Sequence, residues 1–329
     1  MTSAAPHVHS GDSVQKNMLL VIVALLPAFA VSLVAFGWGA LITTVISIGV
    51  CVLTEWCITK YMLKQQPSLL DLSAVLTGLL LAMNLPSNLP WWMTILGAVF
   101  AIGIGKMVFG GIGQNVFNPA LVGRVFLLIS FPAAMTTWPK AEGFATKYLD
   151  AQTEATPLYY LKHIVKEGDS SVLDQLPSLR DALLGSMGGS LGEICAIALL
   201  IGGIFLICTR VITWHIPVSI LATVALLAAC TGWFGALPEG MTTCEYVGYE
   251  LLTGGVMLGA IFMATDYVTS PMTAWGKIIF GVGIGVIVMV IRTWGAYPEG
   301  MSFAILIMNG CVPLLNRIAP KRFGEVAKK

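Results

Sequence analysis

The chain has 329 residues, of which 57% are hydrophobic and only 11% are charged, and its formal net charge is +1. Soluble domains usually carry about 25% charged residues, so this composition indicates an integral membrane protein. The near-neutral charge gives no reason to expect a nucleic acid as a partner. The seven cysteines include no CxxC pair, which argues against a zinc or iron–sulfur site held by this chain alone.

The apolar segments of the chain predict an all-α integral membrane protein. A helix needs roughly 20 apolar residues to cross a bilayer, and about 17 can suffice. Candidate crossings in the first half are residues 18–36, 40–58, 70–85, 92–109 and 118–135. Candidates in the second half are residues 191–209, 214–231, 249–265, 277–291 and 301–316. We therefore expect about ten transmembrane helices in two halves of five.

One long hydrophilic connection, residues 138–188, separates a first membrane half at 18–137 from a second at 189–317. Short tails at 1–17 and 318–329 flank the two halves. With these crossings, both tails lie on one side of the membrane and the long connection lies on the other. This connection is the only long hydrophilic segment between the predicted crossings.

The distribution of basic residues predicts the orientation of the chain. The short loops on the side of the two tails hold Lys60, Lys64, Lys106, Arg210, Lys277 and Arg317. The short loops on the other side hold only Arg292. By the positive-inside rule, both termini are cytoplasmic and the connection 138–188 is extracytoplasmic.

The two halves show a short internal similarity. Leu76-Thr77-Gly78 precedes a glycine-rich span in the first half, and Leu252-Thr253-Gly254 does so in the second. The matched spans are separated by an odd number of crossings, so the two halves would be inverted relative to each other. Inverted repeats place ligand sites at their mutual interface, often at broken helices. Chance similarity between glycine-rich apolar segments is the alternative explanation.

A glycine- and asparagine-rich segment, residues 110–119, would interrupt a helix at membrane depth or at its edge. Irregular backbone there must be buried in protein or line a cavity. The amides of Asn115 and Asn118 suit the pyrimidine edge of a flavin ring. An ordinary helix that begins at Pro119 behind asparagine caps explains the same residues equally well.

Thr156-Pro157 lies in the hydrophilic connection and predicts a helix start, because threonine caps a helix and proline is favoured in its first turn. The unpaired N–H groups and positive dipole end of such a helix also suit a phosphate esterified to the hydroxyl of Thr156. The two roles are compatible. A polar outer loop would also leave this acceptor accessible to a modifying enzyme.

Several ionisable residues lie in or near the apolar segments, namely Glu55, Asp71, Arg124, Glu193 and Asp266. Ionisable residues within a membrane are costly and often mark ion pathways. Most of these lie close to predicted helix ends, where snorkelling or interfacial hydration suffices. Asp266 is the ion-coupling candidate, because threonine and serine hydroxyls crowd it in the sequence.

With these motifs the chain resembles the family that comprises RnfD, a membrane component of the Rnf electron-transport complex, and NqrB of the sodium-translocating NADH:quinone reductase. The resemblance covers residues 71–324 and is most specific in 113–124, 266–273, 295–303 and 320–324. Tyr267 stands where the family typically has proline. The Rnf side of the family is the closer resemblance.

The family's flavin-attachment pattern is an aspartate, then serine or threonine, then usually Gly-Ala-Thr. Asp150, Thr153, Ala155 and Thr156 match this pattern, whereas Glu154 replaces the usual glycine. The resemblance implies FMN joined covalently through its phosphate to Thr156 by a flavin transferase. It also implies a second, noncovalent flavin such as riboflavin. Asn115, Asn118 and Arg124, which lie in the shared motif, are the further candidates for cofactor binding.

The resemblance further implies partner subunits that carry iron–sulfur clusters and flavins, in a prokaryotic plasma membrane. The expected function is a flavin-carrying subunit of an Rnf-type complex that couples electron transfer between ferredoxin and NAD to sodium or proton translocation. An NqrB-like component of a sodium-translocating NADH:quinone reductase is one alternative. The pattern of spans alone would equally fit a cofactor-free transporter or channel, or a structural scaffold for redox subunits.

Overall fold

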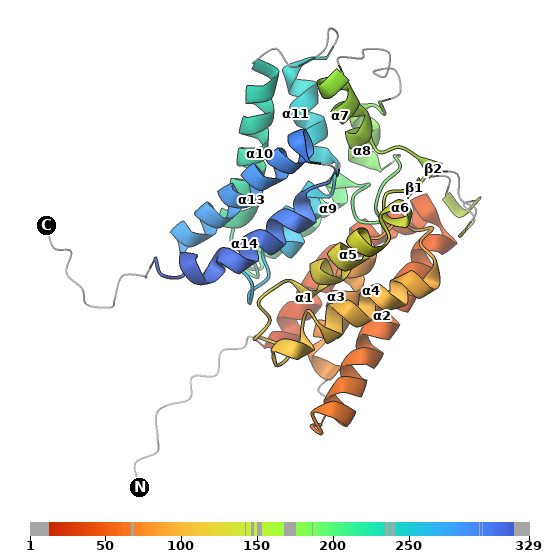
Figure 1. Cartoon of the computed structure of the whole chain (residues 1–329), viewed down its shortest axis with the longest axis vertical. Helices are drawn as coiled ribbons and strands as arrows, with labels where there is room; N and C mark the ends of the chain where they lie inside the picture. Colours follow the sequence, from red (N-terminus) through yellow and green to blue (C-terminus); the bar gives the residue numbers. More distant parts are fainter. Residues whose placement is uncertain are drawn as a thin grey trace, which may run out of the picture.

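The computed structural model describes residues 13–66, 69–141, 143–145, 148–149, 153–167, 176–185, 187–233, 237, 241–295, 297 and 299–318. Helices dominate this part of the chain (Figure 1). Its β-structure is limited to the antiparallel pair of β1 (Trp138–Pro139) and β2 (Thr153–Glu154). The predicted all-α membrane class is confirmed.

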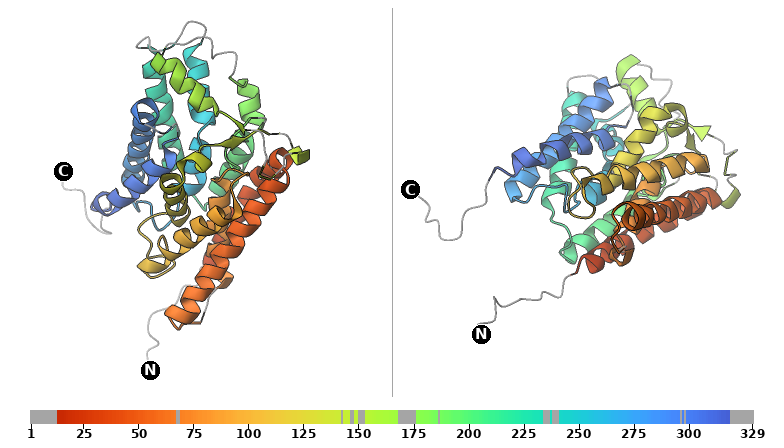
Figure 2. Two further views of the ribbon diagram at one scale, coloured as in Figure 1. Left: turned by 45° about the vertical axis from the view of Figure 1, so that its right-hand side comes forward. Right: turned by 60° about the horizontal axis from the view of Figure 1, so that its bottom comes forward.

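The helices form two groups that lie side by side in Figures 1 and 2. The N-terminal group consists of α1 (Val14–Phe36), α2 (Trp38–Cys57), α3 (Ser73–Met83), α4 (Trp91–Gly103) and α5 (Pro119–Ser130). The C-terminal group consists of α9 (Ala196–Cys208), α10 (His215–Trp233), α11 (Thr243–Leu252), α12 (Val256–Leu258), α13 (Ala274–Trp294) and α14 (Met301–Leu315). Between the groups come α6 (Pro132–Met135), α7 (Pro157–Glu167) and α8 (Leu179–Leu184).

Short π-helices extend two of these elements: η1 (Ile58–Met62) continues α2, and η6 (Gly259–Met263) continues α12. In the described part of the chain, four helical stretches are long and apolar enough to cross a membrane: Val14–Phe36, Trp38–Met62, Trp91–Phe109 and Ala274–Trp294. A fifth results if α11 and the α12–η6 stretch count as one bent crossing. The chain is therefore a multi-pass membrane protein.

This bent crossing corrects one sequence prediction. The sequence predicts a continuous span over residues 249–265, whereas the structure has a helix that begins at Thr243 and bends by 59° between α11 and the α12–η6 stretch. Gly254 and Gly255 form the break with φ of +71° and +67°. Only glycine adopts this left-handed backbone without steric cost, so the glycine pair explains why the helix breaks here.

The two groups have matching internal contacts. In the N-terminal group α2 packs on α3 and α4, and α4 packs on α5. In the C-terminal group α10 packs on α11 and α13, and α13 packs on α14. The groups meet where α1 packs on α9 and where α5 approaches α14. Helices α7 and α8 contact α11 at one end of the molecule, drawn in green at the top of Figure 1.

The starts of α3 and α12 are also alike, because both follow a residue in the left-handed conformation. Leu72 precedes α3 with φ 60° and ψ 7°, and Gly255 precedes α12 with φ 67° and ψ 14°. The register expected from the Leu-Thr-Gly similarity is therefore wrong. Residues 76–78 lie inside α3, whereas residues 252–254 end α11 and enter the break.

Gly78 has a different role from Gly254, namely to let two helices approach closely. A Cβ at Gly78 would lie 2.6 Å from the Cα of Ile48 in α2. The hydroxyl of Ser47 donates to the carbonyl of Gly78 over 2.8 Å, which fixes the same approach. Small residues at such contacts allow membrane helices to pack tightly.

Gly78→Ala is expected to destabilise the protein by about 1–3 kcal/mol, because the added methyl group overlaps the backbone of α2. Gly49→Ala in α2 is the matched control, since its Cβ would meet nothing within 4 Å. The control gains helix propensity without a clash. Melting temperatures in detergent measure both, and equal values for the two variants would contradict this packing.

Candidate functional site

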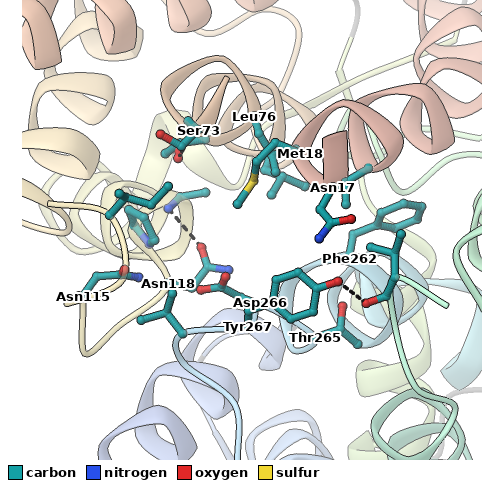
Figure 3. A pocket seen from close by; sticks show the side chains of 18 of the residues that line it. Asn17, Met18, Ser73, Leu76, Asn115, Asn118, Phe262, Thr265, Asp266 and Tyr267 are labelled. Atoms are coloured by element: carbon teal, nitrogen blue, oxygen red, sulfur yellow. Dashed lines mark hydrogen bonds between the residues drawn. The ribbon is translucent and has the colours of Figure 1, made fainter. Parts of the chain in front are cut away.

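A pocket of about 810 Å³, part of it open to solvent, lies where the two groups meet (Figure 3). Its walls come from α1, α3, the end of α9, the end of η6 and the loop before α5. Among its lining residues are Asn115, Asn118 and Asp266. The structure therefore brings three of the predicted site residues together.

Asn118 connects the two groups at this pocket. Its side-chain oxygen caps α5 by accepting from the N–H groups of Ala120 (3.1 Å) and Leu121 (3.4 Å). Its Nδ2 donates to the carbonyl of Met263, the last residue of η6, over 3.1 Å. The predicted asparagine cap before Pro119 is thus confirmed. The neighbouring Asn115 donates to the carbonyl of Phe117 over 3.1 Å and still lines the pocket.

Asp266 lies just beyond η6, at the opposite wall of the pocket from α3 (Figure 3). Its carboxylate accepts from the hydroxyl of Thr269 over 3.1 Å and lies next to the amide of Asn115. A carboxylate from one group thus meets an amide from the other. This arrangement provides oxygen ligands at the end of a broken helix, where transporters bind cations.

A buried ion pair lies at the same pocket. Lys106, just after α4, donates to both oxygens of Glu55 (2.8 and 2.7 Å) and to the hydroxyl of Ser73 (2.6 Å). Lys106 and Glu55 are both buried. Interfacial hydration, expected for Glu55 from the sequence, is therefore wrong, and the charge is balanced by protein. Asp71 in turn accepts from the N–H and the hydroxyl of Ser73 at the start of α3.

Arg292 forms the counterpart of Lys106 in the C-terminal group. From the last turn of α13 it donates to the carboxylate and the carbonyl of Glu250 and, over 2.8 Å, to the carbonyl of Thr253. The guanidinium thereby neutralises Glu250 and satisfies the backbone at the break before α12. Arg292 is buried, so it is not the outer-loop charge that the sequence suggested. Lys106 is likewise buried and is therefore not a loop charge either.

A third buried charge cluster lies further along α5. Arg124 donates to the amide oxygen of Asn84, just after α3, over 2.7 Å and to the carboxylate of Glu299, just before α14. Glu193, before α9, accepts from the N–H of Gly254 and from the hydroxyl of Ser190. Arg124 and Glu193 are buried. Hydration at a membrane surface, expected for both, is therefore wrong.

Thr156 lies at the start of α7, and Pro157 is the first helical residue, as predicted. The carbonyl of Thr156 accepts from the N–H groups of Tyr159 (2.9 Å) and Tyr160 (3.4 Å). Thr156 itself is only 2% exposed. The accessible hydroxyl expected from a polar loop is therefore not what the structure shows.

The other residues of the flavin-attachment pattern lie before this helix. Thr153 is exposed in β2 and Ala155 is half-buried, whereas Asp150 lies outside the described residues. The pairing of β2 with β1 places Glu154 opposite Trp138. Within the described residues, the pattern therefore runs from a short strand at Thr153 to a helix N-terminus at Thr156.

Residues before and after Thr156 in the chain contact residues around a second, smaller cavity. Trp138, the strand partner of Glu154, lines it together with Arg124, Tyr297 and Glu299. On the other side, Lys162 of α7 donates to the carbonyls of Gly295 and Tyr297. This cavity measures about 260 Å³, part of it open to solvent.

Comparison with known proteins identifies the family. The sequence pattern of the NQR2, RnfD, RnfE family matches residues 1–324. The chain belongs to this family. It is 44% identical to the D subunit of the Na⁺-translocating ferredoxin:NAD⁺ oxidoreductase complex of Acetobacterium woodii, over 99% of this chain and 95% of that protein.

Two other relatives also match over nearly their whole length. The D subunit of the ion-translocating oxidoreductase complex of Stutzerimonas stutzeri is 41% identical, over 96% of this chain and 94% of that protein. The D subunit of the proton-translocating ferredoxin:NAD⁺ oxidoreductase complex of Clostridium ljungdahlii is also 41% identical, over 98% and 95%. The named relatives thus differ in the ion that their complexes move.

Sequence reasoning missed Glu250 and Glu299 as members of buried ion pairs. One signal for Glu299 was present, because Pro-Glu-Gly occurs both at 238–240 and at 298–300, directly before apolar helices. A charged residue repeated at the edge of an apolar segment suggests a paired role. Only the structure supplies the partners, since Arg124 and Glu299 are 175 residues apart.

Lys106→Met is expected to destabilise the protein by about 3–5 kcal/mol, because it leaves the carboxylate of Glu55 buried without a partner. The double variant Lys106→Met/Glu55→Gln should be more stable than the single one. Lys60→Met is the matched control, an exposed lysine whose Nζ lies 4.6 Å from the ring centre of Trp56, and it should cost about 1 kcal/mol at most. Unfolding in mixed micelles tests this cycle, and strict additivity of the two single changes would contradict the pairing.

Proposed function

We propose that this chain is the flavin-carrying membrane subunit of an Rnf-type complex, which couples electron transfer between ferredoxin and NAD to sodium or proton translocation. The observation that carries the proposal is the full-length match to the D subunits of such complexes. Its partners in the membrane are then the other subunits of the complex, with their iron–sulfur clusters and flavins. The membrane is the prokaryotic plasma membrane.

In this proposal the chain crosses the membrane about ten times, as two inverted halves. The antiparallel contact of α1 with α9 and the segment before it supports the inversion. Gly202 in α9 packs on Ala24 in α1, whereas Gly185, earlier in the chain at the end of α8, packs on Val31, later in α1. The short helices α3 and α9 complete their crossings through the irregular segments 84–90 and 187–195, which suits backbone that is buried in protein.

The orientation in the proposal has both termini in the cytoplasm and the connection 138–188 on the extracytoplasmic side. Lys60, Lys64, Arg210 and Lys277 support it, because they lie in or next to the turns after η1, after α9 and before α13, on the side where α1 begins in the proposed topology. The positive-inside rule places such turns in the cytoplasm. The difference in basic residues between the two sides no longer includes Lys106 or Arg292, which are buried in ion pairs.

Thr156 is the proposed attachment point of FMN, through a phosphoester made by a flavin transferase. Its place at the N-terminus of α7 supports this, since free N–H groups and the helix dipole stabilise a phosphate. Because Thr156 is buried, the transferase can reach its hydroxyl only when α7 is displaced, for example before this segment docks. Bound flavin would supply one-electron transfer, while the protein sets its position and electrostatics.

Arg124 is the further candidate at this end of the protein. Its Nε is buried and has no hydrogen-bond partner among the described residues, so one donor remains available beside the small cavity. The pairing of β2 with β1 brings Trp138, which lines that cavity, next to the attachment pattern. Thr153, Ala155 and Asp150 are proposed to be the residues of the pattern that the transferase recognises.

The large pocket is the proposed site of a second, noncovalent flavin such as riboflavin. Asn115 and Asn118 supply amides, and Leu76, Leu80 and Phe262 are among the apolar residues of its walls. Asp266, on the same pocket, is the proposed ion-coupling residue, because it is a carboxylate at the end of a broken helix. Electron transfer and cation binding would thus share one region.

Thr156→Ala is expected to leave a folded protein without covalent flavin. The matched control Thr156→Ser keeps the hydroxyl and should keep the flavin. In-gel fluorescence of the denatured chain, expressed with its flavin transferase, measures the result. Covalent flavin on the alanine variant would refute the attachment site, and a denatured wild-type chain without fluorescence would instead favour a cofactor-free transporter.

Asn115→Leu is expected to weaken noncovalent flavin binding about tenfold, which corresponds to the loss of about one hydrogen bond. The covalent flavin at Thr156 should be unaffected. Flavin released by denaturing the purified complex, measured separately from flavin that stays on the chain, tests both statements. An unchanged yield of released flavin at limiting concentration would exclude Asn115 from the site.

A further inference from the structure

Five charged side chains are buried around the break at 253–255 and the end of α3. They are Arg124, Glu193, Glu250, Arg292 and Glu299, and none is more than 8% exposed. With all five ionised, the cluster has one carboxylate in excess. An uncompensated charge in a buried site is costly, so it is neutralised by a proton or held beside a counter-ion.

The excess charge belongs to Glu193 and Glu299. Glu250 is paired with Arg292, which also donates to its carbonyl. Arg124 is the only cation paired with Glu299 among the described residues. Glu193 accepts only from neutral groups in the described structure, the N–H of Gly254 and the N–H and hydroxyl of Ser190.

Glu193 and Glu299 flank Arg124 at the break. Glu193 accepts from the N–H of Gly254, and a Cβ on the next residue, Gly255, would lie 4.0 Å from Nη1 of Arg124, whose Nη2 donates to Glu299. One arginine thus lies between two carboxylates, and it is bonded to only one of them. This arrangement leaves one negative charge for a further partner.

A second observation indicates where that partner binds. The Oε1 atom of Glu299 is buried and has no hydrogen-bond partner among the described residues, although the side chain lines the small cavity. An unpaired, desolvated carboxylate oxygen is costly unless something occupies the adjacent space. Unwound backbone at a helix break commonly forms part of cation sites in transporters.

We propose that Glu193 and Glu299 form a second site for a monovalent cation, either a proton or Na⁺. It lies beside the break before α12 and is separate from the Asp266 pocket. The two regions are related through the similar helix starts after Leu72 and Gly255. Asn84 ends α3 beside Arg124, whereas Asp266 follows η6 beside Asn115.

This inference deepens the proposed function and rests on it only for the role of the site in transport. In an Rnf-type complex, a cation moving along this chain would pass between the Asp266 pocket and the Glu193–Glu299 site. Cation binding itself does not require a flavin on Thr156. A test of cation binding can therefore fail while the covalent flavin is present, and cation binding can be found while the covalent flavin is absent.

Glu193→Gln in the whole purified complex tests the site. Glutamine keeps the acceptor for Gly254, leaves Arg124 with its partner Glu299 and removes the excess charge. Glu245→Gln is the matched control, because Glu245 is exposed in the capping box of α11 and glutamine also serves in such a box. The melting temperature of this chain within the complex is followed in two arms, and covalent flavin is recorded for each sample.

In the first arm Na⁺ replaces K⁺ at constant ionic strength and constant pH. In the second arm the pH is lowered without Na⁺. A sodium site raises the wild-type melting temperature by about 2–4 °C or more in the first arm. A proton site does so in the second arm, since neutralising a buried carboxylate becomes easier as the pH falls. Glu193→Gln should reduce the response in that arm, because only the Asp266 pocket would remain, and Glu245→Gln should keep the wild-type response.

The inference is overturned if Glu193→Gln responds like the wild type in both arms, or if the wild type responds in neither. Those results would leave the proposed function intact as long as covalent flavin is present. Loss of flavin from the wild-type chain, with the cation response retained, would sink the proposed function and leave the site in place.

Discussion

Two buried cations hold the short, broken helices in place. Lys106 follows α4 and reaches the start of α3, and Arg292 lies in the last turn of α13 and reaches the break before α12. Lys106 contacts Ser73 at the start of α3, and Arg292 contacts Thr253 before α12. Each also neutralises a buried carboxylate from a neighbouring helix. Broken helices at membrane depth need such partners, because lipid offers none to exposed backbone groups. Arg292 supplies such a partner to the carbonyl of Thr253, and Lys106 holds the side chain of Ser73 at the start of α3.

The short helices that result end inside the protein, and their ends form the candidate sites. The end of η6 presents Asp266 to the loop that carries Asn115 and Asn118. The end of α3 presents Asn84 to Arg124 and, through it, to Glu299. One pocket therefore lies at the start of α5 and one cavity further along it. This separation places the two candidate cation sites at different positions along α5.

The sequence predicted most elements but not their partners. Apolar length located the helices, and local capping chemistry located the starts of α5 at Pro119 and α7 at Pro157. The buried ion pairs could not be predicted, because Glu55 and Lys106 are 51 residues apart, and a charge near a helix end looks the same whether hydrated or paired. The burial of Thr156 likewise depends on how α7 docks. The role of a glycine could not be read from the sequence, since glycine permits a helix break at Gly254 and close helix packing at Gly78.

The proposed function depends most on a phosphoester at Thr156, which would make this membrane bundle an electron carrier. Peptide mass spectrometry of the chain purified from its native membrane tests this directly. We predict that the peptide containing Thr156 carries the added mass of FMN and that fragmentation assigns it to this residue. The same peptide recovered unmodified from membranes that perform ferredoxin-linked electron transfer would contradict the account.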